Sequence, residues 1–291
     1  MGTTEPPLAG RYVLLDPIGV GGMGSVWRAW DLRERRLVAA KLLGRYDDAL
    51  LQRFVREQAV RVEHPHVVAP TGWAADGGRV VLTMDLVAGG SVADLRAEHG
   101  PLPEPVVARL LDQLLQALEA VHAAGLVHRD VKPANLLLEP GPLHLRLADF
   151  GVAAVLGEPR LTGAGTVGTR GYSAPEQDDG ADPHPAQDLY AVGVVGRELT
   201  GRRPGVLDPL LGALCDPDPA RRPASASEAL VRLRRLPVPV TAAGVVVRDR
   251  LGPAAYPSGA GRRLTVVLAG VCLVCLALAI VLGVAVTLRA T

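Results

Sequence analysis

Short apolar runs punctuated by glycine dominate roughly the first 90 residues of the chain. Runs of this kind, bounded by glycine and proline, are typical of β-strands joined in antiparallel hairpins. They occur in residues 11–31, 35–43 and 67–87. Between the second and third of these segments, residues 48–63 space apolar side chains at helical intervals along one face. The pattern therefore predicts a β-rich region that one helix interrupts.

Later in the chain, after this β-rich region, the spacing of apolar positions becomes helical. In residues 105–125, valine and leucine recur three and four positions apart, and the segment stops at Gly125, a common helix terminator. A small β-rich lobe followed by a larger helical lobe is an α+β arrangement. The chain of 291 residues is long enough to bury a core in both lobes.

The longest apolar run covers residues 264–288 and contains neither a charged residue nor a proline. A helix needs about 20 apolar residues to cross a bilayer, and this run is too long for an ordinary buried core helix. Several arginines precede the run and only Arg289 follows it, so the positive-inside rule predicts that the preceding chain is cytoplasmic. We therefore expect a single-pass protein of the cell membrane, with a juxtamembrane linker at 237–263 and an extracytoplasmic stub at 289–291.

The composition argues against two broad classes of protein and marks three unusual positions. A formal net charge of +1 provides no basic face for nucleic acid, so we expect no nucleic-acid partner. Three cysteines cannot build the disulfide framework of a small secreted domain. Arginine replaces lysine everywhere except at Lys41 and Lys132, and Asn135 is the only asparagine in the chain. These three positions are candidates for chemistry that other side chains cannot perform.

Gly19, Gly21 and Gly24 have the G-x-G-x-x-G spacing of nucleotide-binding loops. The motif alone is weak because the chain contains 33 glycines, and a dinucleotide-binding fold would need a helix directly after it. Residues 25–31 have the character of a strand instead. A glycine-rich hairpin between two strands lets the backbone approach phosphate groups without obstruction by side chains.

Further motifs follow this hairpin along the chain. They are "VAAK" at 38–41, "HRDVKPAN" at 128–135, "DFG" at 149–151, "GTRGYSAPE" at 168–176 and "DLYAVGV" at 188–194. In this order the motifs resemble those of the eukaryotic-type protein kinase family. The motifs, the apolar run and the Ala-, Gly- and Arg-rich composition together make the chain most similar to a bacterial membrane-anchored Ser/Thr kinase from a high-GC, actinobacterial-like organism.

The resemblance implies the bilobal protein-kinase fold plus one C-terminal transmembrane helix. The implied bounds are a tail at 1–10, a kinase domain at 11–236, an N-lobe at 11–86 and a C-lobe at 91–236. One departure concerns the segment between Thr200 and Arg222, which is far shorter than is usual in the family. We therefore expect a C-lobe shortened near helix G, the helix that commonly docks protein substrates in the family.

The resemblance also implies a role for each unusual polar residue near the phosphates. Lys41 would pair with Glu57 and hold the α- and β-phosphates of ATP, a task that suits a compact ammonium group better than a guanidinium. Asp130 would act as the catalytic base that accepts the proton of the substrate hydroxyl. Lys132 would meet the γ-phosphate and, in this family, marks specificity for Ser and Thr.

Metal and nucleotide ligands follow from the same resemblance. Asn135 and Asp149 would ligate Mg²⁺, with Mn²⁺ as an alternative ion. The implied ATP-binding residues lie in the glycine hairpin, the third strand and the hinge, which is the connection between the lobes at residues 84–87. They are Ile18, Gly19, Gly21, Gly22, Gly24, Val26, Ala39, Lys41, Met84, Asp85 and Val87.

Other residues receive structural or regulatory roles from the resemblance. Glu176 and Arg222 match a buried ion pair that braces the C-lobe. The two histidines of "HPHVV", residues 64–68, fall in a helix-to-strand turn, so zinc binding is not expected there. Thr162 and Thr166 are the candidate phosphoacceptors of the activation segment.

We therefore expect a Ser/Thr protein kinase that transfers the γ-phosphoryl group of ATP to hydroxyls of protein substrates. Autophosphorylation, contact with membrane lipid and a homodimer are further expectations. The alternative is a pseudokinase scaffold that binds a nucleotide and signals by docking. Retention of Lys41, Asp130 and Asp149 favours the enzyme, whereas the shortened C-lobe favours the scaffold.

Overall fold

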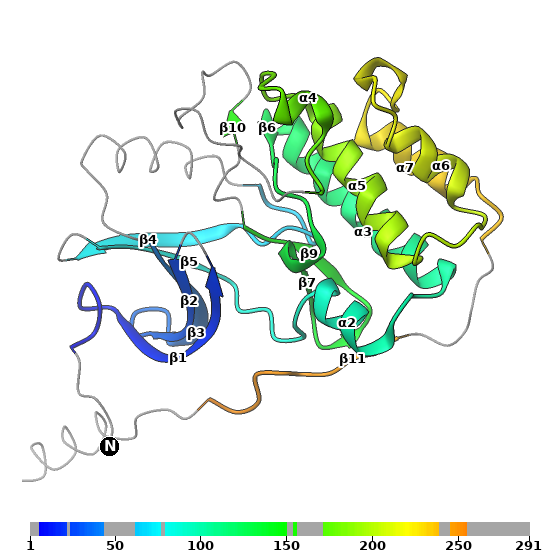
Figure 1. Cartoon of the computed structure of the whole chain (residues 1–291). Coiled ribbons are helices and arrows are strands. Elements are labelled where there is room, and N and C mark those ends of the chain that lie inside the picture. The colour runs from blue at the N-terminus through cyan, green and yellow to red at the C-terminus, as the bar shows by residue number, and fades with distance from the viewer. Residues whose placement is uncertain are drawn as a thin grey trace, which may run out of the picture. The chain divides into compact units, whose positions relative to one another are not determined.

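The computed structural model describes most of the chain between residues 6 and 254. The described residues are 6–21, 24–43, 62–76, 79–149, 154–155, 171–238 and 245–254. Residues 7–252 form one compact unit, and the fold described below is the fold of that unit (Figure 1). Most of the predicted helix at 48–63 lies outside the described residues, as does the predicted membrane segment at 264–288. Within the described ranges, no helix has the length and apolar character needed to cross a membrane.

The N-terminal part is an antiparallel sheet of five strands in the order β1-β2-β3-β5-β4. The strands are β1 (Tyr12–Gly21), β2 (Gly24–Asp31), β3 (Arg36–Leu43), β4 (Pro70–Asp76) and β5 (Arg79–Met84). Alternation along β3 puts Val38 and Ala40 into a small core with Tyr12 on one face of the sheet. Ala39 and Lys41 therefore lie on the opposite face. The three sequence segments predicted to form strands, residues 11–31, 35–43 and 67–87, contain all five strands of this sheet.

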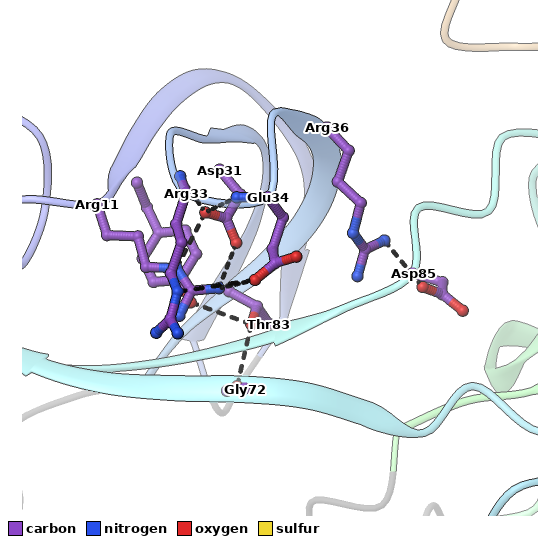
Figure 2. Close-up of polar contacts among 9 residues, drawn as sticks. Arg11, Asp31, Arg33, Glu34, Arg36, Gly72, Thr83 and Asp85 are labelled. Atoms are coloured by element: carbon purple, nitrogen blue, oxygen red, sulfur yellow. Dashed lines mark hydrogen bonds and ion pairs between the residues drawn. The ribbon is translucent and has the colours of Figure 1, made fainter.

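Polar contacts fasten the sheet at its outer hairpin and beside the hinge (Figure 2). Arg11 makes a two-pronged ion pair with Asp31, at 2.9 Å from Nε and 2.6 Å from Nη2, which joins the start of β1 to the end of β2. These hydrogen bonds lower the pKa of Asp31 despite its burial. At the same end of the sheet, where Arg36 pairs with Asp31 in the register of β2 and β3, Arg36 Nη1 lies 3.0 Å from Asp85 Oδ1, so the residue that follows β5 is tied to the start of β3.

The C-terminal part is helical and carries short strand pairs. Its helices are α2 (Val92–His99), α3 (Glu104–Ala123), α4 (Pro175–Asp178), α5 (Pro185–Leu199), α6 (Asp208–Leu214) and α7 (Ala226–Arg234). Its short 3-10 helices are η1 (Pro133–Asn135) and η2 (Pro219–Arg221). Its strands are β6 (Leu126–Val127), β7 (Leu136–Leu138), β8 (Gly141–Pro142), β9 (Leu145–Leu147), β10 (Ala154–Val155) and β11 (Val246–Val247).

Helix α3 is the centre of the larger core. Its leucines at 110, 111, 114, 115 and 118 are all buried, and Figure 1 shows α5 and α7 beside it. Gly125, with φ of +75°, follows the helix in the left-handed conformation that favours glycine. The sequence therefore predicted the end of α3 correctly.

The short segment between Thr200 and Arg222 contains α6 and the single turn η2. Leu210, Leu211 and Leu214 of α6 are buried, so this helix belongs to the core with α5 and α7. Within described residues 171–238, no additional helix projects from this segment as a docking element.

The stretch expected to be the juxtamembrane linker, residues 237–263, is packed along part of its length. Within it, β11 pairs antiparallel with β8, in the register Val246–Pro142 and Val247–Gly141. Val247 is buried and joins the core of the helical part. The packed stretch extends to Gly252, the last residue of the compact unit.

Candidate active site

The loop after β6 carries the "HRD" motif and is fixed by a carboxylate from α5. Asp188 is buried, and its oxygens accept hydrogen bonds from the backbone N–H groups of His128 at 2.9 Å and Arg129 at 2.7 Å. His122 Nε2 lies 2.8 Å from the same carboxylate. Burial alone would raise the pKa of Asp188, but the contact with His122 and the other hydrogen bonds lower it. An ionised carboxylate therefore holds the loop.

The backbone at this loop is in an uncommon conformation. Arg129 has φ of +66° and Asp149, in the facing "DFG" motif, has φ of +67°. Left-handed conformations of this kind cost free energy for residues with a side chain, and such residues gather at functional sites. The hydrogen bonds to Asp188 supply part of the force that holds Arg129 in this conformation.

The carboxylate of Asp130 is contacted by two other residues of the "HRDVKPAN" motif, Lys132 and Asn135. Lys132 Nζ lies 2.7 Å from Asp130 Oδ2, and Asn135 Nδ2 donates to the same oxygen at 2.9 Å. Asn135 Nδ2 also donates to the backbone carbonyl of Asp130 at 2.8 Å. The turn η1 brings Asn135 back toward Asp130 and makes these contacts possible. The carboxylate is thereby oriented by one cation and one amide.

Lys41 on β3 forms an ion pair with Asp149, which follows β9. The two residues are 108 positions apart and come from the two lobes. Asn135 connects this pair to the loop of Asp130, because its backbone carbonyl accepts a hydrogen bond of 2.9 Å from Ala148. His128 Nε2 also contacts the Ala148 carbonyl at 3.1 Å. Five of the six polar residues that the sequence singled out for this site, all except Glu57, which lies outside the described residues, therefore gather in one place.

Apolar residues border the junction between the sheet and the helical lobe. Met84 ends β5 opposite Ala39, and Val87 follows it in a small buried cluster with Val68 and Ala148. The connecting residue Asp85 is held between Arg36 and Arg146, with Arg146 Nη2 at 3.2 Å. Apolar side chains beside a connecting backbone segment suit contact with a nucleotide base.

The remaining predicted nucleotide-binding residues lie on the first hairpin. Ile18, Gly19, Gly21, Gly24 and Val26 belong to β1 and β2, where Gly21 pairs with Gly24 and Val26 pairs with Lys41. The hairpin replaces the helix that a dinucleotide fold would need, as the sequence predicts. Outside the described residues are Gly22, Glu57, Thr162 and Thr166, so the pairing of Lys41 with Glu57 stays a prediction.

The type of ligand atom at the site suits a divalent hard cation. Among the described residues, no group of three or more histidine, cysteine, aspartate or glutamate side chains could hold a metal ion. Asn135 and Asp149 offer amide and carboxylate oxygens, which Mg²⁺ prefers, and Asn135 uses its amide nitrogen on Asp130. A Mg²⁺ ion held by two protein residues completes its shell with phosphate oxygens and water.

Sequence reasoning found the bracing ion pair and missed the anchor of the catalytic loop. Arg222 meets Glu176 through two contacts of 2.6 and 2.8 Å, as expected. The sequence did not lead us to assign a role to Asp188. The signal that could have pointed to it is the presence of a single carboxylate in the first turn of the apolar helix α5. Gln177 was also missed; its Nε2 donates to the Arg129 carbonyl at 3.1 Å.

The two histidines of "HPHVV" lie in a turn that leads to Val67, as the sequence predicts. His66 Nδ1 lies 2.8 Å from the Leu145 carbonyl, so this ring fastens the turn to β9.

Comparison with known proteins identifies the class of fold and site. Residues 12–207 match the protein kinase domain family. Among curated relatives, the chain is 38% identical over 221 residues to the serine/threonine-protein kinase PkaA of Streptomyces coelicolor, which covers 68% of this chain and 40% of that protein. It is 38% identical over 214 residues to PknL of Mycobacterium tuberculosis, with 70% and 53% covered. It is 37% identical over 232 residues to PknA of the same species, with 74% and 54% covered.

The chain belongs to the protein kinase domain family, because the family model matches more than half of its length. It spans about half the length of the curated relatives it matches. These relatives are serine/threonine-protein kinases of actinobacteria, as the composition of the chain predicts.

Proposed function

We propose that the chain is a Ser/Thr protein kinase that transfers the γ-phosphoryl group of ATP to hydroxyl groups of proteins. The observation that carries the proposal is the arrangement around Asp130. Its carboxylate is held by Lys132 and Asn135, and the backbone of Asn135 links it to the pair formed by Lys41 and Asp149. The family membership and the names of the relatives support the same activity.

Each polar residue has a distinct part in the proposed reaction. The oxygen of the substrate hydroxyl attacks the γ-phosphorus, the bond from that phosphorus to the β,γ-bridging oxygen breaks, and ADP leaves. Asp130 orients the hydroxyl and accepts its proton. Lys132, 2.7 Å from Asp130, lies where it can balance negative charge on the transferred group. Lys41 holds the phosphates that stay on ADP.

Asn135 and Asp149 would hold Mg²⁺, or Mn²⁺ in its place, and the ion supplies positive charge to the phosphate oxygens. The base of ATP would lie between Val26 and Ala39 of the sheet and the apolar cluster that contains Met84 and Val87. The backbone of residues 85–87 offers donors and acceptors for its polar edge. The ion pairs of Asp85 with Arg36 and Arg146 fix this connection.

We further propose that residues 264–288 anchor the kinase in the cell membrane and that the kinase domain lies in the cytoplasm. Support comes from the apolar run and from the arginines that precede it. Membrane lipid would then be a partner of the chain. Two anchored copies would meet at a high effective concentration, which favours autophosphorylation within a homodimer.

The test of the proposed activity uses the full chain, purified in detergent. Wild type is incubated with γ-labelled ATP and Mg²⁺ beside the Asp130→Asn variant, and a basic protein serves as a generic acceptor. We expect label on serine or threonine for wild type and none for the variant. Binding of ATP without label on either protein would instead favour the scaffold alternative.

A further inference from the structure

Residues 245–252, here called the strap, leave the helical lobe and reach the sheet of the other lobe. Figure 1 shows this segment in orange, from β11 toward the side of β1. At its start, β11 pairs with β8. Further along, the backbone N–H of Arg250 donates to the Ala88 carbonyl at 2.8 Å, immediately after the hinge. The strap is therefore fastened first to the helical lobe and then to the connection between the lobes.

The side chain of Arg250 adds two contacts on the helical side. Its Nε donates to the Gly89 carbonyl at 3.1 Å, and its Nη2 lies 2.7 Å from a carboxylate oxygen of Glu98 on α2. Glu98 is half exposed, so the ion pair alone contributes little stability. The bond to the Gly89 carbonyl adds a charge-assisted contact beside the backbone bond to Ala88.

Two glycines after the hinge make room for the strap. A Cβ on Gly89 would lie 2.5 Å from Val247 Cγ1 and 2.3 Å from the Leu138 carbonyl. A Cβ on Gly90, where φ is +79°, would lie 2.5 Å from Cδ of Arg250. A side chain at Gly89 would collide with the Leu138 backbone and with Val247, and one at Gly90 would displace the side chain of Arg250. The surface against which the strap lies is therefore shaped for close approach.

The far end of the strap is held by Arg28 of β2, whose side chain is buried. Arg28 Nη1 donates to the Leu251 carbonyl at 3.2 Å and to the Gly252 carbonyl at 2.9 Å. Its Nε donates to Asp16 Oδ1 on β1 at 2.8 Å. Asp249 Oδ1 accepts the N–H groups of Leu251 and Gly252 at 2.8 and 3.0 Å, which shapes the turn that presents these carbonyls. One guanidinium thus joins β1, β2 and the strap.

The position of Arg28 connects the strap to the proposed nucleotide site. Arg28 lies directly opposite Ala39 in the register of β2 and β3, and Val26 lies two residues away on the same face. Lys41 shares this face because it is two residues beyond Ala39. The strap is therefore bonded to the face of the sheet that would cover the nucleotide, and to the hinge on the other side.

We propose that the strap ties the two lobes together across the hinge and that Arg28 is a positioning residue for ATP binding. The proposal rests on the proposed kinase function. ATP needs groups from both lobes at once. Its apparent affinity therefore depends on the fraction of molecules in which the two lobes are in the arrangement that binds ATP. A strap bonded to both lobes raises that fraction. Once ATP saturates the site, the strap contributes little to the chemical step.

The test compares full-length wild type with Arg28→Ala, Arg28→Lys and Arg11→Ala. Arg11 is the matched control, because it also pairs with an aspartate of the first hairpin, while its side chain bonds to Asp31 and Glu34 instead of to the strap. We expect Arg28→Ala to raise KM for ATP about fivefold while kcat stays within about twofold, since only the competent fraction falls. Arg28→Lys should restore part of the affinity, and Arg11→Ala should leave KM unchanged.

Hydrogen exchange provides a readout that does not depend on turnover. We expect the backbone N–H groups of Arg250, Leu251 and Gly252 to exchange faster in Arg28→Ala than in wild type, and Mg·ADP to slow their exchange in wild type alone. If Arg28→Ala does not fold, Asp249→Ala tests the same attachment, because it removes only the acceptor within the strap.

The outcomes separate the two proposals. If wild type is an active kinase, an unchanged KM and unchanged hydrogen exchange in Arg28→Ala would overturn the proposed role of the strap and leave the proposed kinase function intact. Equal increases in KM for ATP in Arg28→Ala and Arg11→Ala would also overturn it, because general weakening of the sheet would then explain both. A wild type that binds Mg·ADP with strap protection but transfers no phosphate would overturn the kinase function and support the strap. A wild type that binds no nucleotide would overturn both.

Discussion

The carboxylate of Asp188 accepts a 2.7 Å hydrogen bond from the backbone N–H of Arg129, 59 residues earlier in the chain. Arg129 is the residue before Asp130, so the position of the proposed catalytic base depends on a side chain of α5. Asp188 is buried and also binds the neighbouring N–H of His128 and the ring of His122. A single ionised group in the core thus sets the path of the loop.

Replacement of Asp188 by asparagine should lower both activity and stability. The amide has one acceptor oxygen, so at least one buried N–H of the loop loses its partner, at a cost of about 1–3 kcal/mol. We expect kcat/KM to fall roughly 100-fold, because displacement of a catalytic group by about 1 Å has an effect of that size. Asp112→Asn, which disturbs a surface ion pair with Arg234 of α7, is the control and should retain activity.

The stability difference between wild type and Asp188→Asn should depend on pH. The pKa of Asp188 in the folded protein lies below its ordinary value of 3.8. Its contribution to stability is therefore fully present above that value and disappears as the pH falls through the folded pKa. Thermal unfolding should show a constant difference in Tm from about pH 7 to about pH 5 and a shrinking difference below 3.8. A constant difference down to the lowest pH would contradict an ionised Asp188.

Lys41→Met and Asp130→Asn should each abolish phosphotransfer while the protein stays folded. Each substitution removes a charge that acts on the phosphates or on the attacking hydroxyl, so a loss on the order of 1,000-fold or more is expected. Initial rates with labelled ATP give the loss, and circular dichroism checks the fold. Arg33→Met changes an exposed cation of the same lobe and should leave the rate within about twofold. Substantial activity in either of the first two variants would remove that residue from the mechanism.

Arg222→Lys should destabilise the helical lobe more than the same change at the neighbouring Arg221. The side chain of Arg222 is 0% exposed and grips both oxygens of Glu176, whereas Arg221 is 75% exposed. Burial would raise the pKa of Glu176, but the bonds from Arg222 lower it. Lysine cannot reproduce the fork, so the free energy of unfolding should fall by about 3 kcal/mol. Urea denaturation measures this, with about 0.5 kcal/mol or less expected for Arg221→Lys.

Phosphorylation of the activation segment, residues 149–176, should control the rate. We expect Thr162 or Thr166 to carry the phosphate and Arg129 to pair with it. Treatment of active enzyme with a phosphatase should lower the rate, and incubation with ATP should restore it. Mass spectrometry of wild type beside Asp130→Asn identifies sites that depend on autophosphorylation. An unchanged rate after complete dephosphorylation would remove the regulatory role from both threonines.

Membrane association should require the apolar character of residues 264–288. Paired substitution of Leu276 and Leu278 by arginine places two charges in the run, each costing about 2.5–3.5 kcal/mol near the centre of a membrane helix. Wild type should resist extraction from membranes by carbonate, and the paired variant should be extracted. Replacement of the same two leucines by isoleucine is the control. Equal extraction of all three proteins would contradict the anchor.

Local signals in the sequence determined much of this protein. Alternation and glycine punctuation located the strands, helical spacing located α3, and Gly125 located its end. Residue chemistry marked Lys41, Lys132 and Asn135, because a composition that favours arginine retained them. Signals of this kind depend on neighbours a few positions apart, or on the identity of one side chain, and so can be recognised without a fold.

Only the tertiary structure decided how these residues meet. The anchoring of Arg129 by Asp188 joins residues 59 positions apart, and the bond from Arg28 to Gly252 joins residues 224 positions apart. No periodicity records such pairs, because each depends on how whole helices and strands pack. Residues 237–263, expected to be a linker, have a Pro- and Gly-rich composition typical of a coil. Within this stretch, the buried Arg28 donates hydrogen bonds to the carbonyls of Leu251 and Gly252, and Gly89 and Gly90 leave room beside Val247 and Arg250.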